Sequence, residues 1–256
     1  MIKGIDVSIH NGNVNFEKVK QSGIDFVILR IGYRGYATGD LKIDTNFLSN
    51  YDRAKKRGLY VGGYFFSQAK NKKEGREERD FCIKIIKDNN IYFDYPVYID
   101  TEWANNSHTG RADNISIVDR TLAIYEFCET MQIKNGFYVG IYRSENWLKT
   151  KTNYSALTSF DKWIAKWSDS APSKQYGKYN MWQYSNNYKI DGIRFDISYA
   201  YIDFAKVIKD KGLNKVRKHK MYDLNIDNIS AGDMLTFKKL CEDLKLTEFS
   251  ITEKEV

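Results

Sequence analysis

Four acidic residues stand where strands are predicted to end, which is where barrel enzymes carry their catalytic groups. Asp6 closes a first strand at the N-terminus, and Asp196 lies in the last predicted strand. Asp100 and Glu102 stand together at the end of a fourth strand. Alternate residues of a strand share a face, so these two are expected to project the same way, with Cα atoms about 6.5 Å apart.

Clustered carboxyl groups of this kind can cleave a glycosidic bond. A protonated acid donates to the leaving oxygen, and a second carboxylate stabilises or traps the developing positive charge. Mutual repulsion raises a carboxyl pKa, which keeps one acid protonated near neutral pH. An Asp-x-Glu pair alone is weak evidence, because caps, ion pairs and metal ligands share the pattern. The convergence of four acids favours catalysis.

The elements that must position these acids alternate along the chain. Short apolar runs predict strands, and amphipathic segments between them predict helices. This order predicts an α/β fold, an irregular (β/α)8 TIM-like barrel. The late connections are too short for regular helices, so some late strands are expected to be antiparallel. Strands are predicted at 2–8, 26–31, 60–66, 97–101, 137–142, 162–167, 180–184 and 195–199, and helices at 15–23, 45–57, 72–89, 116–131, 144–149 and 202–209.

The chain is predicted to hold two domains. Residues 1–210 form the barrel, and the Lys-rich stretch 211–220 is a linker. Residues 221–256 predict a small C-terminal β-α-β domain, close to the lower size limit for folding alone. We expect it to bind the cell wall or to form a homo-oligomer, with self-association favoured because its sheet edges are open.

Composition narrows the function further. The 256 residues carry a net charge of +7, which suits a polyanionic partner. Nucleic acid is not expected, because no nucleic-acid motif accompanies the charge. The three cysteines and three histidines are scattered along the sequence, so neither a metal site nor a disulfide framework is expected. The sequence also lacks a glycine-rich phosphate-binding loop, so no cofactor is expected. No apolar run is long enough for a membrane span, and no signal peptide is evident at Met1.

Several short motifs in their order along the chain resemble the family 25 glycoside hydrolases, the muramidases of the Chalaropsis lysozyme type that are common among bacteriophage endolysins. The resemblance covers about residues 1–208. Each motif alone is unspecific, but together they are specific. They are Gly4-Ile5-Asp6-Val7-Ser8, Gly63-Tyr64-Phe65-Phe66, Asp100-Thr101-Glu102, and Met181-Trp182-Gln183-Tyr184 followed by Asp196.

The resemblance implies hydrolysis of the β-1,4 bond between N-acetylmuramic acid and N-acetylglucosamine in peptidoglycan. It makes Glu102 the general acid, with Asp6, Asp100 and Asp196 in the same pocket. The substrate's own acetamido group is the expected nucleophile, oriented by Asp100 or, as the other candidate, Asp196. Phe65 departs from the family's His, and Ser198 from its Asn. The predicted substrate-binding residues are Tyr33, Tyr64, Phe66, Trp103, Tyr142, Trp167, Gln183 and Tyr184.

Other interpretations remain open. A chitinase-like barrel also carries Asp-x-Glu on its fourth strand, but its motif has an Asp where this chain has Tyr98. A glucosaminidase and a catalytically inactive wall-binding protein are further alternatives. For the muramidase, the resemblance implies an endolysin that waits in the host bacterial cytoplasm until it reaches a Gram-positive wall.

Overall fold

Runs of β-branched and aromatic residues form the strands of this protein, as such side chains pack well on a pleated surface. The strand β2 is apolar on nearly every residue because both of its faces are covered. In the described part of the chain the strands are β1 (Ile2–Val7), β2 (Phe26–Arg34), β3 (Leu41–Ile43), β4 (Tyr60–Phe66), β5 (Val97–Asp100), β6 (Val139–Ser144), β7 (Asp161–Ala165), β8 (Met181–Ile190) and β9 (Ile193–Ala200).

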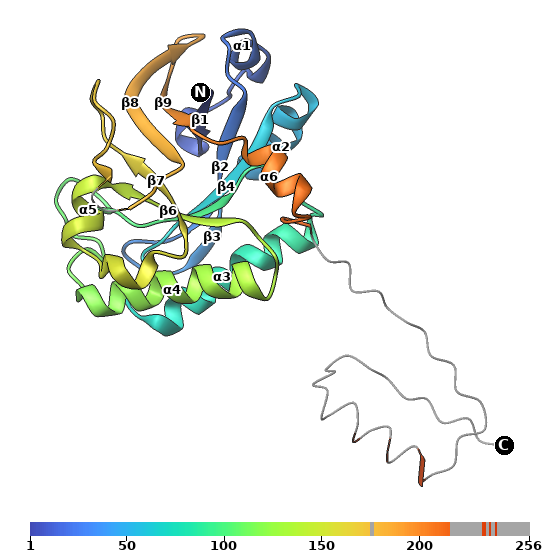
Figure 1. Ribbon diagram of the computed structural model, residues 1–256, viewed down its shortest axis with the longest axis vertical. Helices are drawn as coiled ribbons and strands as arrows, with labels where there is room; N and C mark the ends of the chain where they lie inside the picture. The colour runs from blue at the N-terminus through green and yellow to red at the C-terminus, as the bar shows by residue number, and fades with distance from the viewer. Residues whose placement is uncertain (175–176, 216–231, 234–235, 237–238, 240–256) are drawn as a thin grey trace. The chain divides into compact units, whose positions relative to one another are not determined.

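Eight of these strands close into a barrel in the order β1-β2-β4-β5-β6-β7-β8-β9, because β9 pairs with β1. Neighbours from β1 to β8 run parallel, whereas β9 is antiparallel to both β8 and β1. The TIM-like barrel and the antiparallel late strand are therefore confirmed. In Figure 1, β8 and β9 form a long hairpin beside β1.

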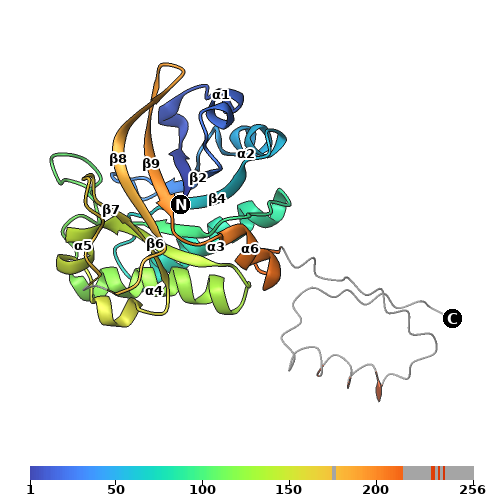
Figure 2. The same ribbon diagram turned by 45° about the horizontal axis from the view of Figure 1, so that its top comes forward.

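Helices cover the outside of the barrel and begin at polar caps. The Asn71 side chain accepts from the Glu74 N–H at the start of α3, and the Ser116 side chain accepts from the Asp119 N–H at the start of α4. These two long helices lie side by side in both views (Figures 1 and 2). The helices are α1 (Phe16–Gln21), α2 (Phe47–Lys56), α3 (Lys72–Asp88), α4 (Ile117–Ile133), α5 (Glu145–Thr150) and α6 (Phe204–Asp210).

Alternating side chains divide the core into an outer layer against the helices and a barrel interior. Large aromatic rings fill the lower interior, and two strand glycines make room for them. A Cβ on Gly4 would lie 2.2 Å from the Phe26 ring, and one on Gly140 would lie 2.3 Å from the Tyr98 ring. These rings occupy the interior near the amino ends of the strands, whereas the acids predicted from the sequence lie toward the carboxyl ends, where barrel enzymes carry their active sites.

One strand is absent from the sequence-based prediction. The short strand β3 pairs antiparallel with the end of β2 and was not predicted. Three residues give too little periodicity to identify a strand. The connection from β7 to β8 contains no α-helix in its described residues, as its short length had indicated.

The computed structural model describes residues 1–174, 177–215, 232–233, 236 and 239. The chain divides into two units, and all elements named above belong to the first, Met1–Arg217. Apart from residues 232–233, 236 and 239, the β-α-β unit predicted for 221–256 lies outside the described residues, and so does the predicted linker beyond residue 215. Within the described ranges, no helix combines the length and apolar character needed to cross a membrane.

Candidate active site

The antiparallel pairing of β1 with β9 places Asp6 directly opposite Asp196. Side chains opposite each other in such a ladder have Cβ atoms about 5 Å apart, so the two carboxyl groups are neighbours. Gln183 of β8 connects them, because its Nε2 donates to Asp6 Oδ2 at 3.0 Å and to Asp196 Oδ2 at 3.3 Å. Both acids are half-buried.

Asp100 ends β5, and Glu102 follows two residues later, beyond the strand. Asp100 is only 4% exposed, and its Oδ1 has no hydrogen-bond partner in the described part of the protein. Glu102 is half-buried, and no described residue hydrogen bonds to its carboxyl group. A carboxyl group without protein partners keeps its hydrogen-bonding capacity for a ligand.

Burial raises the pKa of all four acids, and the charges of neighbouring acids raise it further at Asp6, Asp100 and Glu102. Burial, and then the charge of Asp196, raises the pKa of Glu102 to about 7. Burial raises the pKa of Asp196 to about 6. The pKa of Asp6 lies well above its usual range because of burial and the Asp196 charge. The pKa of Asp100 is raised in the same way by burial and by Glu102, so the site can hold a proton near neutral pH.

The positive charges of Arg143 and Arg30 lower the pKa of Asp100 and so oppose the effect of burial and of the neighbouring acids. Arg30 is fixed by an ion pair, with its Nε 2.7 Å from Asp44 Oδ2. Arg143 is fully buried, and burial followed by the neighbouring charge of Arg120 lowers its own pKa to about 9. Arg30, Asp44 and Arg143 were not predicted from the sequence. Their one sequence signal is a charged residue inside or directly after an otherwise apolar strand.

The structure brings some of the predicted aromatic residues to the acids. Burial, and then the charge of Asp6, raises the pKa of the Tyr64 phenol, and the charge of Asp100 adds to the rise. Tyr142 is buried and donates to Gln183 Oε1 at 2.9 Å. Trp167 is 59% exposed and donates to the same oxygen at 3.0 Å. A large exposed ring next to a carboxylate cluster suits stacking on a sugar.

The other aromatic residues that were predicted to bind substrate form no hydrogen bond with the four acids in the described part of the chain. Tyr33 and Phe66 are register partners on β2 and β4, and both are half-buried. Trp103 follows Glu102, but its ring already stacks on His108 at 3.9 Å between centroids. Tyr184 stacks on Tyr199 at 4.3 Å and packs against the outer core layer. The structure therefore does not bring Tyr184 to the four acids.

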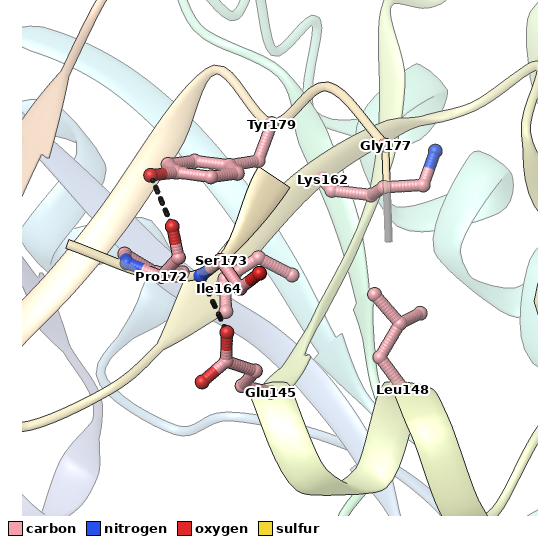
Figure 3. A pocket seen from close by; sticks show the side chains of 8 residues that line it. All are labelled: Glu145, Leu148, Lys162, Ile164, Pro172, Ser173, Gly177 and Tyr179. Carbon is pink, nitrogen blue, oxygen red and sulfur yellow. Dashed lines mark hydrogen bonds between the residues drawn. The ribbon is translucent and has the colours of Figure 1, made fainter. Parts of the chain in front are cut away.

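A small pocket opens on the outer side of β7 (Figure 3). Two hydrogen bonds lie within it, from Tyr179 Oη to the Pro172 carbonyl at 3.0 Å and from the Ser173 N–H to Glu145 Oε1 at 2.5 Å. It contains none of the predicted site residues. The pocket lies where a regular barrel would place a helix, so we interpret it as a packing gap. Its lining comprises Glu145, Leu148, Lys162, Ile164, Pro172, Ser173, Gly177 and Tyr179.

Nothing in the described residues resembles a metal centre, since no group of three or more His, Cys, Asp or Glu side chains is arranged to hold an ion. Two cysteines, Cys82 and Cys128, are buried and unpaired. The groups brought together at the site include four carboxyl groups, the phenol of Tyr64 and the charge of Arg30.

Comparisons with known proteins find similarity to lysozymes. The chain is 26% identical to lysozyme M1 of Streptomyces globisporus over 77% of its own length, and 29% identical to an autolytic lysozyme of Clostridium acetobutylicum over 75%. It spans only 66% and 53% of those two proteins.

Among solved structures, the autolysin LytC of Streptococcus pneumoniae, in complex with a synthetic peptidoglycan ligand, matches with a TM-score of 0.67 and 26% identity, over 77% of this chain and 46% of that one. The bacterial lysozyme of Streptomyces coelicolor shares the fold, with a TM-score of 0.66 and 24% identity over 81% of this chain and 95% of that one. The profile of glycosyl hydrolases family 25 matches residues 5–193, which include Asp6, Asp100 and Glu102, and the chain therefore belongs to that family.

Proposed function

We propose that the protein is a muramidase that hydrolyses the β-1,4 bond from N-acetylmuramic acid to N-acetylglucosamine in peptidoglycan. Its family and its lysozyme relatives support this activity. The observation that carries the proposal is the state of Glu102. Its carboxyl group is half-buried, has no described protein partner, and has a pKa raised to about 7 by burial and Asp196. Such a group holds a proton up to neutral pH and is free to donate it.

Glu102 is the general acid in this proposal, and it protonates the oxygen that leaves the muramic acid carbon. The acetamido carbonyl oxygen of that sugar attacks the same carbon. A carboxylate of the enzyme accepts a hydrogen bond from the acetamido N–H and so orients the acetamido group. We assign this helper role to Asp196, because it is half-buried whereas Asp100 is buried. This reverses the order of the two candidates that the resemblance suggested. Asp100 is buried close to Glu102, and burial followed by the charge of Glu102 raises its pKa.

The test is digestion of purified Gram-positive peptidoglycan, followed by borohydride reduction and mass spectrometry of the fragments. A muramidase leaves reduced muramic acid at the fragment ends. Reduced glucosamine ends would instead identify a glucosaminidase. Binding to the wall without fragment release would identify an inactive wall-binding protein. Digestion of chitin in place of peptidoglycan would favour the chitinase-like alternative.

We further propose that the protein acts as a bacteriophage endolysin on a Gram-positive wall, held in the host cytoplasm until release. The net charge of +7 supports attraction to anionic wall polymers. Expression in a Gram-positive host should leave the cells intact until the membrane is permeabilised and should then lyse them. Lysis without permeabilisation would contradict the proposed storage in the cytoplasm. The self-association predicted for residues 221–256 is tested by light scattering, where a monomer mass would contradict it.

A further inference from the structure

Gln183 is a buried amide at the centre of the carboxylate cluster, with a side chain in contact with four polar partners. It is 1% exposed. Its Nε2 donates to one oxygen each of Asp6 and Asp196, at 3.0 and 3.3 Å. Its Oε1 accepts from the Tyr142 hydroxyl at 2.9 Å and from the Trp167 indole N–H at 3.0 Å.

These four contacts use the whole hydrogen-bonding capacity of the amide. A primary amide has two N–H donors and an oxygen with two lone pairs. The orientation of the amide is also determined, because an indole N–H can only donate and must face the oxygen. The nitrogen of Gln183 therefore faces the two carboxyl groups. No donor or acceptor of this side chain remains for a sugar.

We propose that Gln183 is a positioning residue, which holds Asp6 and Asp196 side by side as hydrogen-bond acceptors and makes no hydrogen bond to substrate. The inference rests on the proposed muramidase function and changes the role expected for Gln183 from the sequence. It also connects the exposed ring of Trp167 to the half-buried carboxyl pair through a single amide. A sugar stacked on that ring would be held in a fixed position relative to both acids.

The charge balance explains why such a residue is needed. Asp6 and Asp196 repel each other, and burial disfavours their ionised forms, whereas the Gln183 hydrogen bond favours ionised Asp6. The amide supplies two donors without adding a charge. The other titratable and charged groups around the pair are Arg30, Tyr64, Asp100, Glu102 and Tyr142.

The test compares Gln183→Glu with Asn214→Asp in the full chain. Asn214 is also a buried amide, but it binds the backbone of Phe93, Tyr95 and Tyr138. Loss of the Nε2 donor should raise the pH at which the carboxyl pair ionises. The acidic limb of the kcat/KM profile should therefore move up by about one pH unit. We expect kcat to fall about tenfold or more with KM nearly unchanged.

The control exchange should lower the melting temperature and leave the acidic limb in place. A Gln183→Glu variant with a higher KM and an unmoved profile would mean that Gln183 binds substrate. A lower melting temperature with an unmoved profile would mean a structural role alone. Either result overturns the proposal. A wild-type protein without fragment release would instead contradict the proposed function, which separates the two failures.

A substitution at the exposed Trp167 provides a second test in case the Gln183→Glu variant does not fold. Trp167→Phe preserves a ring but removes one donor to the amide. The matched variant is Trp182→Phe, which removes an indole donor from the Lys166 carbonyl instead. The acidic limb should move upward in the first variant only. Identical profiles for the two variants overturn the proposal.

Discussion

Replacing Glu102 with glutamine is expected to stabilise the folded protein at alkaline pH, because the wild-type acid must ionise in a site that disfavours its charge. Burial and Asp196 raise its pKa from 4.5 to about 7. At about 1.4 kcal/mol per pH unit, this difference corresponds to about 3 kcal/mol of unfolding free energy. Since the folded-state pKa is the raised one, the contribution is fully present below pH 4.5 and is lost as the pH rises through 7.

The uncharged amide of the Glu102→Gln variant would mimic the protonated acid at every pH. The unfolding free energy of this variant should therefore match the wild type at pH 4 and exceed it by about 3 kcal/mol at pH 8. Urea unfolding followed by tryptophan fluorescence at both pH values measures this difference. The control is Glu17→Gln, at an exposed acid paired with Arg57 on the surface, for which we expect less than about 1 kcal/mol. Equal stability of Glu102→Gln and wild type at pH 8 would refute the reasoning.

Two further substitutions test the framework around the site. Arg34→Met should lower the unfolding free energy by about 3 to 5 kcal/mol, because it leaves the fully buried Glu78 without the arginine whose Nε lies 2.9 Å from its Oε1. Urea unfolding measures this change, and a loss below about 1 kcal/mol would contradict the prediction. Gly140→Ala should cost about 1 to 3 kcal/mol, because the new Cβ would lie 2.3 Å from the Tyr98 ring; an unchanged melting temperature would contradict it.

The fold was largely predictable because its strands are short apolar runs with a clear period. Seven of the eight barrel strands agree with the predicted ranges within about three residues, whereas β8 continues to Ile190, beyond the end predicted at residue 184. Antiparallel pairing at the end of the barrel followed from connections too short for a helix. The pairing of β3 with β2 was not predictable, since its three residues gain their strand geometry from the neighbouring strand.

The acids of the candidate site were predictable because they stand at the ends of predicted strands. The contacts between residues far apart in the sequence were less predictable. Asp6 and Asp196 are 190 residues apart in sequence and become neighbours only because β9 closes the barrel. The opposite faces of β8 separate Gln183 from Tyr184, although the two were grouped in one motif. Arg30 and Arg143 were missed because a charge in an apolar strand gives no sign of its partner.

The central claim is that Glu102 supplies the proton, and the pH dependence of peptidoglycan cleavage tests it most directly. Release of reducing ends by the wild type should fall about tenfold per pH unit above pH 7, because only the protonated acid is active. Glu102→Gln should release none above background at any pH, while remaining folded. A wild-type rate that stays level to about pH 9, two pH units above that pKa, or a Glu102→Gln variant that still cleaves peptidoglycan, would contradict the account.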